Sequence, residues 1–394
     1  MIGEHKMSEA IFKNKIHRET VEVYYWPKFQ RDEEMAGGEI RAMYLIPEFK
    51  KISKNRAVTV VPSEVFKDGA FERSAMIRRL LVVFLFPLYM RRIFPKKKYT
   101  ISFVYCSTCY AWELLPALVL RLFRRFKIVC VSHDTPAQLE GYNFYRKSEM
   151  KGIIKSIIMT GIEKLQEFLL RFVDVPIAIS SFAMDFFSPS HIRSRALLSS
   201  NGVPTIYPSK ESIHHRKFDI VYVGRVIERK NLRTVLKALS LFQQDINFLL
   251  ITNSSEDHVS SLINENLTND HVSVTVKYKV NEEDKYLLLN DSKISINLSY
   301  DENFSISTLE TAACGNALVL SNRDFFRQIY GDAAVYADPF DAAAVFTCIE
   351  SLLIDQGELD RMSDMALSIA EKYQYSNIAM TEYSEIRKAV EKNS

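Results

Sequence analysis

The chain has 394 residues, of which 47% are hydrophobic and 25% charged, and its formal net charge is +3 at pH 7. This length is too great for one ordinary core and suits two domains, and the composition is that of a folded protein rather than a disordered one. No segment reaches the roughly 18 to 20 apolar residues that span a bilayer, which excludes an integral membrane helix.

The small net charge hides two halves of opposite sign. Residues 1–204 contain 32 Lys/Arg and 20 Asp/Glu, whereas residues 205–394 contain 19 and 28. Such a split predicts two domains with different partners, and the basic half suits an anionic membrane or a nucleic acid. The odd number of cysteines and the lack of a secretory signal lead us to expect a reducing cytoplasm. Cys106 and Cys109 form a lone C-x-x-C without a second pair, so packing thiols explain them better than zinc ligands do.

Short apolar runs rich in Val and Ile alternate with helical patterns along the whole chain. Runs of this kind are typical of strands buried on both faces of a parallel sheet, and the helical stretches between them complete βαβ units. In the first half the expected strands are 21–26, 57–61, 99–105, 127–132 and 175–180. In the second half they are 218–223, 246–252, 272–277, 294–298, 317–321 and 334–337. Expected helices include 231–242, 282–289 and 375–392.

A polar stretch from 207 to 217 separates the two halves. The simplest architecture is therefore α/β, with two Rossmann-like doubly wound domains that face each other across a cleft. We expect the first domain over 1–207, the second over 208–374, and a C-terminal helix over 375–394 that packs back toward the first domain. Sheets of this kind bind ligands beyond the carboxyl ends of their strands, so both domains should present loops to the cleft.

The first motif that carries chemistry follows the expected strand 218–223. This strand runs into Gly224, and Arg225 and Lys230 follow, five residues apart, before Asn231 opens or caps a helix. Cations and a helix N-terminus directed at one point suit a diphosphate. A solvated basic turn is the alternative, because basic turns after strands are common.

The second motif is a pair of glutamates, Glu302 and Glu310, on either side of a small-residue stretch after the expected strand 294–298. We expect a helix to begin at Thr308, with free amides around Ser307 and Thr308 that face the cleft. A carboxylate at the start of this helix can accept hydrogen bonds from vicinal ribose hydroxyls. In the alternative, Glu310 is only a helix N-terminal charge and Glu302 only a loop acid.

In order and spacing, these two motifs resemble the GT-B glycosyltransferases of the group 1 (GT4) family. The resemblance covers most of the chain, strongly from residue 218 to 340 and more loosely before residue 130. Other elements similar to the family's are Gly37-Gly38, Ser132-His133-Asp134, Ile179-Ser180-Ser181, Asn201-Gly202-Val203 and residues 313–319. The chain departs from the family pattern after the first glutamate, where residues 303–307 replace Gly-Phe-Gly-Leu-Pro, and at Asn231, which replaces a glycine.

The resemblance implies roles in donor binding for residues of the second domain. Arg225 and Lys230 would hold the donor diphosphate, and the amides near Ser307 and Thr308 would stabilise the charge that develops on the leaving oxygen. Glu310 would bind the nucleotide ribose. The chain contains no Asp-x-Asp, which agrees with a transfer that requires neither a metal nor another cofactor.

The resemblance also implies roles at the sugar that is transferred. Glu302 would lie against this sugar and support the reaction, and His133 would contact it from the opposite domain. Gly38 would let the backbone approach the phosphate or the acceptor. The family reaction retains the anomeric configuration by front-face attack, with the phosphate taking the acceptor proton. By spacing alone, His133 is more simply a structural histidine.

The implied function is the transfer of a hexose, with mannose as one candidate, from a UDP- or GDP-sugar to a lipid-linked or glycan acceptor in cell-surface polysaccharide or glycolipid synthesis. The first domain would take the acceptor and the second the donor. One alternative is a non-catalytic nucleotide-sugar-binding or membrane adaptor with the same fold. A nucleotide-binding oxidoreductase or epimerase would require a G-x-G-x-x-G fingerprint, which the chain lacks. The residues do not identify the base or the sugar.

Apolar segments with basic neighbours predict peripheral association with the cytoplasmic face of a membrane. They are residues 80–90, 115–126 and 152–172. The alternative is a set of ordinary sheet-covering helices with basic outer faces. A nucleic acid is not expected as a partner, because the basic residues stand among aliphatic blocks rather than among spaced polar and stacking side chains.

Overall fold

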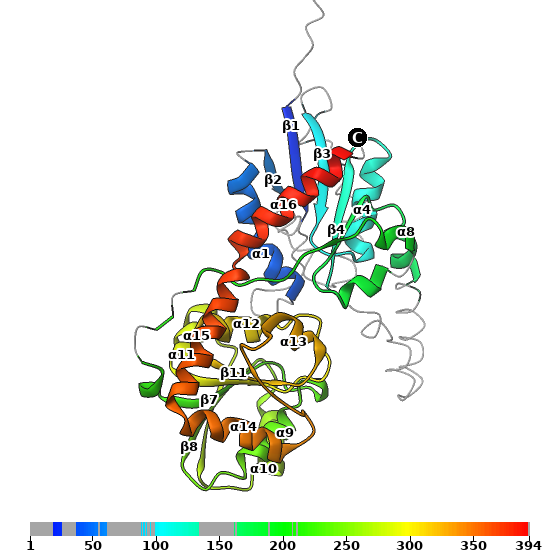
Figure 1. Ribbon diagram of the computed structural model, residues 1–394. Coiled ribbons are helices and arrows are strands. Elements are labelled where there is room, and N and C mark those ends of the chain that lie inside the picture. The colour runs from blue at the N-terminus through cyan, green and yellow to red at the C-terminus, as the bar shows by residue number, and fades with distance from the viewer. Residues whose placement is uncertain are drawn as a thin grey trace, which may run out of the picture.

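The computed structural model describes residues 19–25, 37–53, 56–60, 99–133, 164–187, 190–206, 208–209 and 212–392, and the single residues 88, 90, 92, 95 and 161. These residues form two α/β domains that lie end to end in Figure 1, the N-terminal domain above the C-terminal one. Each domain is built on a six-stranded parallel sheet with helices packed against it. The predicted fold class is therefore confirmed.

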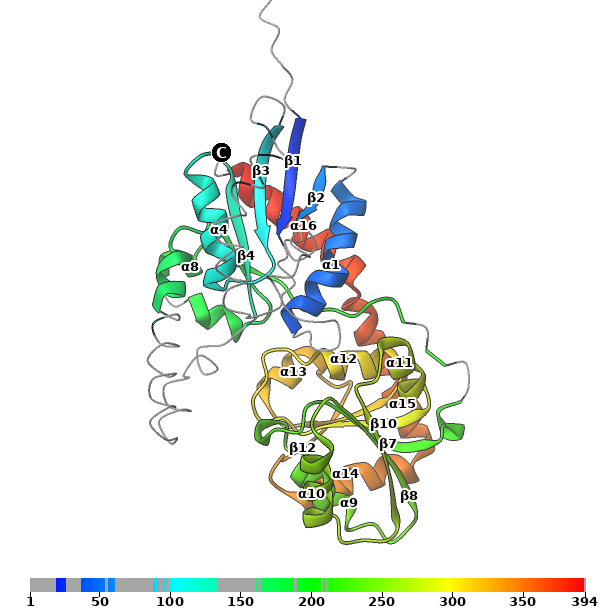
Figure 2. The same cartoon turned by 180° about the vertical axis from the view of Figure 1, so that it is seen from behind.

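The N-terminal sheet has the strand order β2-β1-β3-β4-β5-β6. In Figure 1, α16 crosses in front of these strands. In Figure 2, which shows the opposite side, the strands lie in front of α16, so this helix covers one face of the sheet. Helix α4 packs against β3 and β4. The elements are β1 (Glu19–Tyr25), α1 (Gly37–Ser53), β2 (Ala57–Val60), β3 (Tyr99–Cys106), α4 (Ala111–Arg121), β4 (Lys127–Ser132), β5 (Val175–Ala178), η3 (Ala183–Phe187), α8 (Ser190–Arg193), β6 (Leu197–Leu198) and α16 (Tyr375–Lys392).

The C-terminal sheet has the strand order β12-β11-β10-β7-β8-β9. Its apolar residues form separate clusters on the two faces, as expected for strands that alternate with helices. The elements are η4 (Ile213–His215), β7 (Phe218–Val223), η5 (Glu228–Lys230), α9 (Leu232–Leu239), β8 (Ile246–Thr252), α10 (Glu256–Asn266), β9 (Val272–Tyr278), α11 (Glu282–Asn290), β10 (Ser292–Asn297), α12 (Ile306–Ala313), β11 (Ala317–Ser321), α13 (Asp324–Tyr330), β12 (Val335–Ala337), α14 (Ala342–Ile354) and α15 (Gln356–Lys372).

The expected strands correspond to the observed ones with small shifts at their ends. β4, β7, β8 and β11 have the predicted bounds, as does α16. The two-residue β6 was not predicted, because so short a segment with one exposed leucine carries no periodicity. The predicted strand ends at Trp26 and Val61 lie outside the described residues. Among the described helices, none combines the length and the apolarity needed to cross a membrane.

The two domains are joined at a tight crossing of two segments. Val203, in the connection between the domains, pairs with the start of α16, where Val203 N donates to Tyr373 O and Tyr375 N donates to Val203 O, both at 3.0 Å. The neighbouring Gly202 makes this approach possible, because a Cβ at this position would lie 2.6 Å from Tyr373 O and from Ile378 Cδ1. A glycine is required here by space rather than by backbone conformation.

Helix α16 is held on the N-terminal domain by a buried ion pair. Arg41 of α1 pairs through Nη2 with the Glu382 carboxylate, and the two side chains are 2% and 1% exposed. Arg41 also donates from Nη1 to Tyr105 Oη (2.7 Å) and from Nε to Ser200 O (3.0 Å), and Tyr105 Oη donates to Glu382 at 2.9 Å. These bonds satisfy charges that would otherwise be costly to bury.

Candidate active site

The predicted cations lie on the turn that follows β7. After Gly224 the chain forms η5 and then Asn231, which occupies the N-cap position of α9 in the left-handed conformation (φ 55°). Its side chain does not cap a backbone amide; it donates to Pro339 O and accepts from Thr234 Oγ1 at 2.9 Å. Asparagine is one of the few residues besides glycine that adopt this conformation readily, which explains how it can replace a glycine at this position.

Lys230 on this turn meets Glu302 on the loop after the neighbouring strand β10. Lys230 Nζ pairs with Glu302 Oε1, and the Glu302 side chain is only 8% exposed. Arg229 lies 3.5 Å from the other carboxylate oxygen and donates to Asp301 O at 2.8 Å. One buried carboxylate and two cations therefore meet at the carboxyl edge of the sheet. Arg225 is exposed and forms no ion pair with the described residues.

Helix α12 follows the Glu302 loop and begins at Ile306, so the predicted start at Thr308 is two residues late. The first amide that bonds into the helix is that of Leu309, which donates to Ser305 O at 3.3 Å. The amides of Ile306, Ser307 and Thr308 precede it and are therefore the free N–H groups of the first turn. The correction adds one amide to the expected anion-binding end of this helix.

The side chain of Thr308 serves the fold of this loop. Asn297 at the end of β10 donates to Thr308 Oγ1 (2.8 Å) and to Ser305 Oγ (3.0 Å), and Thr308 Oγ1 lies 2.9 Å from Ser305 Oγ. Thr308 is buried, whereas Ser307 is half-buried. Within residues 303–307, which depart from the family pattern, Ser305 thus holds the helix start through side-chain hydrogen bonds to Asn297 and Thr308.

Glu310 lies one turn farther along α12 and faces α11. Its carboxylate pairs with Lys285 Nζ at 2.8 Å and accepts from Tyr286 Oη at 3.3 Å. Burial and the nearby Glu310 charge raise the pKa of Tyr286 well above its usual value, so this phenol stays a hydrogen-bond donor. Glu310 and Glu302 therefore belong to two separate polar clusters at the same edge of the sheet.

The N-terminal domain contributes His133, directly after β4. Burial, followed by the Arg41 charge, lowers the pKa of His133 to about 3, so the imidazole is neutral at physiological pH. Its Nε2 lies 3.3 Å from Ser107 O, and its buried Nδ1 has no hydrogen-bond partner among the described residues. A neutral ring whose Nδ1 lacks a partner can accept a hydrogen bond from a sugar hydroxyl, whereas it is not suited to hold a positive charge. Asp134 of the same motif lies outside the described residues.

Direct contacts across the domain boundary connect the clusters. Asn303, next to Glu302, donates from Nδ2 to His133 O at 2.7 Å. Tyr44 of α1 donates to the Glu282 carboxylate at the start of α11, and its ring stacks on Tyr375 with centroids 5.5 Å apart. The structure therefore brings His133 close to the Glu302–Lys230 pair, and it places α1 beside the helix that carries Lys285.

Several residues that support the site were not singled out from the sequence. Arg229, Lys285 and Asn303 act through partners from other strands or the other domain, which a linear pattern does not reveal. Glu113 of α4 is buried and accepts from Ser107 Oγ (2.9 Å) and Thr108 N (2.8 Å), so it shapes the loop whose carbonyl contacts His133. Burial raises the Glu113 pKa to about 7. No cluster of His, Cys, Asp and Glu with metal-binding geometry occurs among the described residues.

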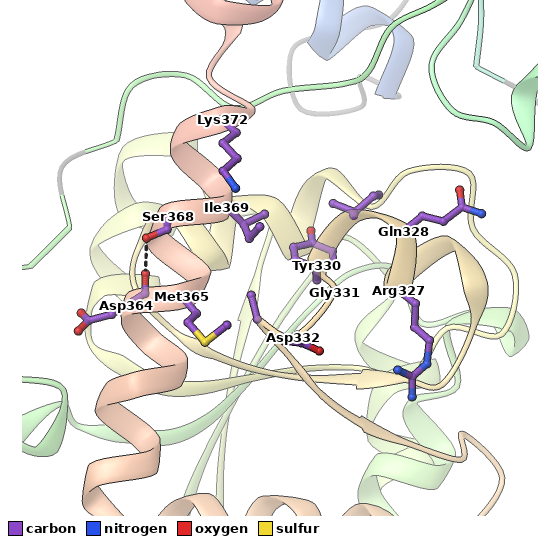
Figure 3. A pocket seen from close by; sticks show the side chains of 12 residues that line it. Arg327, Gln328, Tyr330, Gly331, Asp332, Asp364, Met365, Ser368, Ile369 and Lys372 are labelled. Carbon is purple, nitrogen blue, oxygen red and sulfur yellow. Dashed lines mark hydrogen bonds between the residues drawn. The ribbon is translucent and has the colours of Figure 1, made fainter.

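The pocket in Figure 3 lies elsewhere on the C-terminal domain. It is an open hollow of about 460 Å³ between α13 and α15, lined by residues such as Arg327, Tyr330, Met365 and Lys372. None of the predicted site residues lines it. We therefore place the candidate active site at the carboxyl edges of the two sheets instead.

Gly38 is packed against His133, and this contact gives a testable prediction. A Cβ at residue 38 would lie 3.1 Å from His133 Cδ2 and 3.2 Å from Thr108 Cγ2. We expect Gly38→Ala to displace the ring by a few tenths of an ångström and to lower kcat/KM by about tenfold, because catalytic geometry is sensitive to small displacements. The control is Gly161→Ala, where nothing lies within 4 Å of the added carbon. Equal activity of the two variants would contradict a role for this contact.

Comparison with known proteins finds similarity in sequence and in structure. Residues 205–368 match the family described as glycosyl transferases group 1. A stretch of 162 residues is 28% identical to the O-antigen chain mannosyltransferase B of Escherichia coli, and this match covers 40% of the chain and 42% of that relative.

Among solved structures, sucrose-phosphate synthase from Thermosynechococcus elongatus superposes with a TM-score of 0.67 at 15% identity, over 94% of this chain and 99% of that one. Anabaena HepE in complex with UDP-glucose gives a TM-score of 0.66 at 14% identity, over 93% and 99%. At these identities the structural likeness establishes the fold alone.

Proposed function

We propose that this chain, in which residues 205–368 form a group 1 glycosyltransferase domain within a GT-B fold, is a retaining hexosyltransferase that uses a nucleotide-diphosphate sugar. The observation that carries the proposal is the pair of Lys230 with the buried Glu302, which lies on the loop that leads into α12 and is next to Asn303, the residue that contacts His133. A diphosphate, a sugar and two protein domains can meet there. Arg225, exposed on the same turn, completes the phosphate-facing side.

In the proposed reaction, the bond between the anomeric carbon and the diphosphate oxygen breaks while the acceptor oxygen bonds to the same face of that carbon. The acceptor proton passes to the leaving phosphate oxygen. Lys230, Arg225 and the amides of Ser307 and Thr308 stabilise the negative charge on the diphosphate, without a metal. Glu302 and the neutral His133 orient the sugar from opposite sides, and Gly38 leaves room for the ring of His133.

The nucleotide is proposed to bind at the second polar cluster, with its ribose hydroxyls on Glu310. HepE was solved with UDP-glucose, and the curated relative is named a mannosyltransferase; the proposed donors are therefore UDP-hexoses and GDP-mannose. The relative's name also supports an acceptor in surface polysaccharide synthesis, on a lipid carrier or a glycan, with the enzyme peripheral on the cytoplasmic face of the membrane.

Thermal shift with UDP, GDP and ADP tests donor binding, because a ligand that binds the native state raises its apparent stability. The nucleotide that stabilises the protein should lose about ten- to a hundredfold in affinity in Glu310→Gln, the effect of one hydrogen bond to a charged group. The exposed Glu283 of α11 provides the control variant Glu283→Gln. The 2′-deoxynucleotide should bind both Glu310→Gln and wild type weakly. If wild type binds it as tightly as the ribonucleotide, Glu310 does not read the ribose.

Turnover distinguishes the enzyme from an adaptor with the same fold. Release of UDP or GDP from the matching sugar donor, in the presence of a glycan acceptor, supports the transferase. Nucleotide binding without any turnover across UDP-glucose, UDP-galactose and GDP-mannose would favour the adaptor.

A further inference from the structure

Large apolar side chains gather on one surface of the N-terminal domain. Residues 164–170 are helical, and Leu165, Phe168 and Phe172 are spaced so that they lie on one side of this helix and its end. The ring centroids of Phe168 and Phe172 lie 5.4 Å apart. Leu122 and Phe123 stand on the turn after α4. The two segments are joined by Arg121, which donates to Phe172 O at 2.8 Å. All five apolar side chains are 41% to 81% exposed. We call this surface the apolar–basic patch.

The charges around the apolar–basic patch are mainly positive. Arg125 and Arg171 are exposed next to the apolar residues. Arg124 is 9% exposed, yet its Nη2 has no hydrogen-bond partner among the described residues. The nearby acids are paired: Asp174 with Arg121 at 3.0 Å and Lys127 at 3.4 Å, and Glu167 with Lys164 at 2.9 Å. The net charge that remains is therefore cationic.

The patch lies at the end of the sheet away from the cleft. The turn at 122–125 precedes β4, and residues 171–174 precede β5, so both stand at the amino ends of parallel strands. His133 follows the carboxyl end of β4. Figure 2 shows α4 along the outer flank of the N-terminal domain. A partner on this surface would leave the carboxyl edge, and with it the candidate active site, open.

We propose that the apolar–basic patch docks the protein onto an anionic lipid bilayer. Exposed leucine and phenylalanine side chains enter the headgroup region, and Arg125 and Arg171 contact lipid phosphates. Apolar residues flanked by cations are the combination that interfacial binding requires. A second copy of the chain fits less well, because a symmetric contact would bring the arginines of both copies together. The inference rests on the membrane location in the proposed function and is independent of the transfer chemistry.

The structure also changes which segments we assign to the membrane. Within residues 115–126, Ala117 and Leu120 are buried, and only the end of the segment is exposed. Residues 80–90 are described only at Leu88 and Met90, so the expectation for them lies outside the described residues. Among the described residues, the docking surface is thus a pair of turns and one helix face.

Vesicle flotation of the full chain tests the proposal. Wild type should float with vesicles of phosphatidylcholine and phosphatidylglycerol and not with phosphatidylcholine alone, and binding should weaken as salt rises. The variant Phe123→Ser/Phe168→Ser/Phe172→Ser should lose at least tenfold in affinity, and Arg125→Gln/Arg171→Gln several-fold. The control Leu241→Ser/Ile354→Ser/Met380→Ser removes three apolar side chains that are 43% to 72% exposed elsewhere and should float as wild type does.

Each alternative has its own outcome. Flotation of the phenylalanine variant at wild-type affinity would overturn the proposal, as would failure of wild type to bind anionic vesicles. A change in solution mass between wild type and this variant, without vesicle binding, would identify a self-association surface instead. The nucleotide-induced thermal shift, measured on every variant, reports folding and the donor site separately. If wild type binds anionic vesicles but shows no transfer activity, the proposed function is contradicted and the docking proposal is not.

Discussion

Replacing Lys230 by alanine is expected to lower kcat by about 10²- to 10³-fold, the loss seen when one fixed donor to a developing negative charge is removed. Lys230 is 13% exposed and paired with the buried Glu302, so its ammonium is held in place at low dielectric, where it stabilises a leaving diphosphate most strongly. Because that charge grows in the transition state, kcat should fall more than KM rises. Steady-state kinetics with the donor identified by thermal shift measures both.

Lys293 provides the matched control for this variant. It pairs with Asp219 at 2.8 Å in the same domain, and the two side chains are 20% and 16% exposed. Both residues stand near the amino ends of β10 and β7, so the pair lies at the edge opposite the candidate site. Lys293→Ala removes a similar ion pair and should leave kcat within about twofold, as expected for a change distant from the chemistry. Equal losses in the two variants would mean that Lys230 acts through stability.

The largest effect on stability is expected from Glu382→Ala. This change leaves the Arg41 guanidinium buried at 2% exposure without its carboxylate, and breaking a buried ion pair on one side costs about 3–5 kcal/mol. The free energy of unfolding, measured by urea denaturation, should fall by that amount. The loss should appear in the unfolding of the N-terminal domain, because Arg41 lies in α1 and Tyr105 in β3.

Glu385 lies one turn farther along α16 and pairs with Lys388 at the surface. Glu385→Ala should change the free energy of unfolding by no more than about 0.5 kcal/mol. The double variant Arg41→Met/Glu382→Leu should be more stable than Glu382→Ala, since it leaves no unpaired buried charge. If Glu382→Ala is as stable as Glu385→Ala, the pair does not hold α16 in place.

The sequence predicted the fold well where the signal is local. Strands such as β4 and β7 are short, mostly apolar segments rich in Val and Ile, a pattern that local sequence shows directly. The start of α12 was placed two residues late, because it is fixed by Asn297 through hydrogen bonds to Ser305 and Thr308. A hydrogen bond between distant residues does not change the hydrophobic periodicity of the sequence, so it could not be predicted from it.

The candidate site was predictable in its charged members and not in their partners. Glu302, Glu310 and Lys230 stand out by their spacing after strands. That Lys230 pairs with Glu302, and Lys285 with Glu310, depends on β10 lying beside β7 and α11 lying beside α12. The contact from Asn303 to His133 joins the two domains, and these residues are 170 positions apart in the chain. Spacing along a sequence carries no information about such distances.

The position of α16 has a consequence for biosynthesis. The N-terminal domain lacks part of its own core until the last helix has been made, since Tyr383, Ile386 and Val390 belong to the same apolar cluster as β1 and β3. Glu22 in β1 receives its bond from Tyr383 at 2.9 Å. The first domain to be synthesised is therefore completed only after α16 has been made. All six described strands of the C-terminal sheet precede α16 in the chain, so we expect the C-terminal domain to fold first.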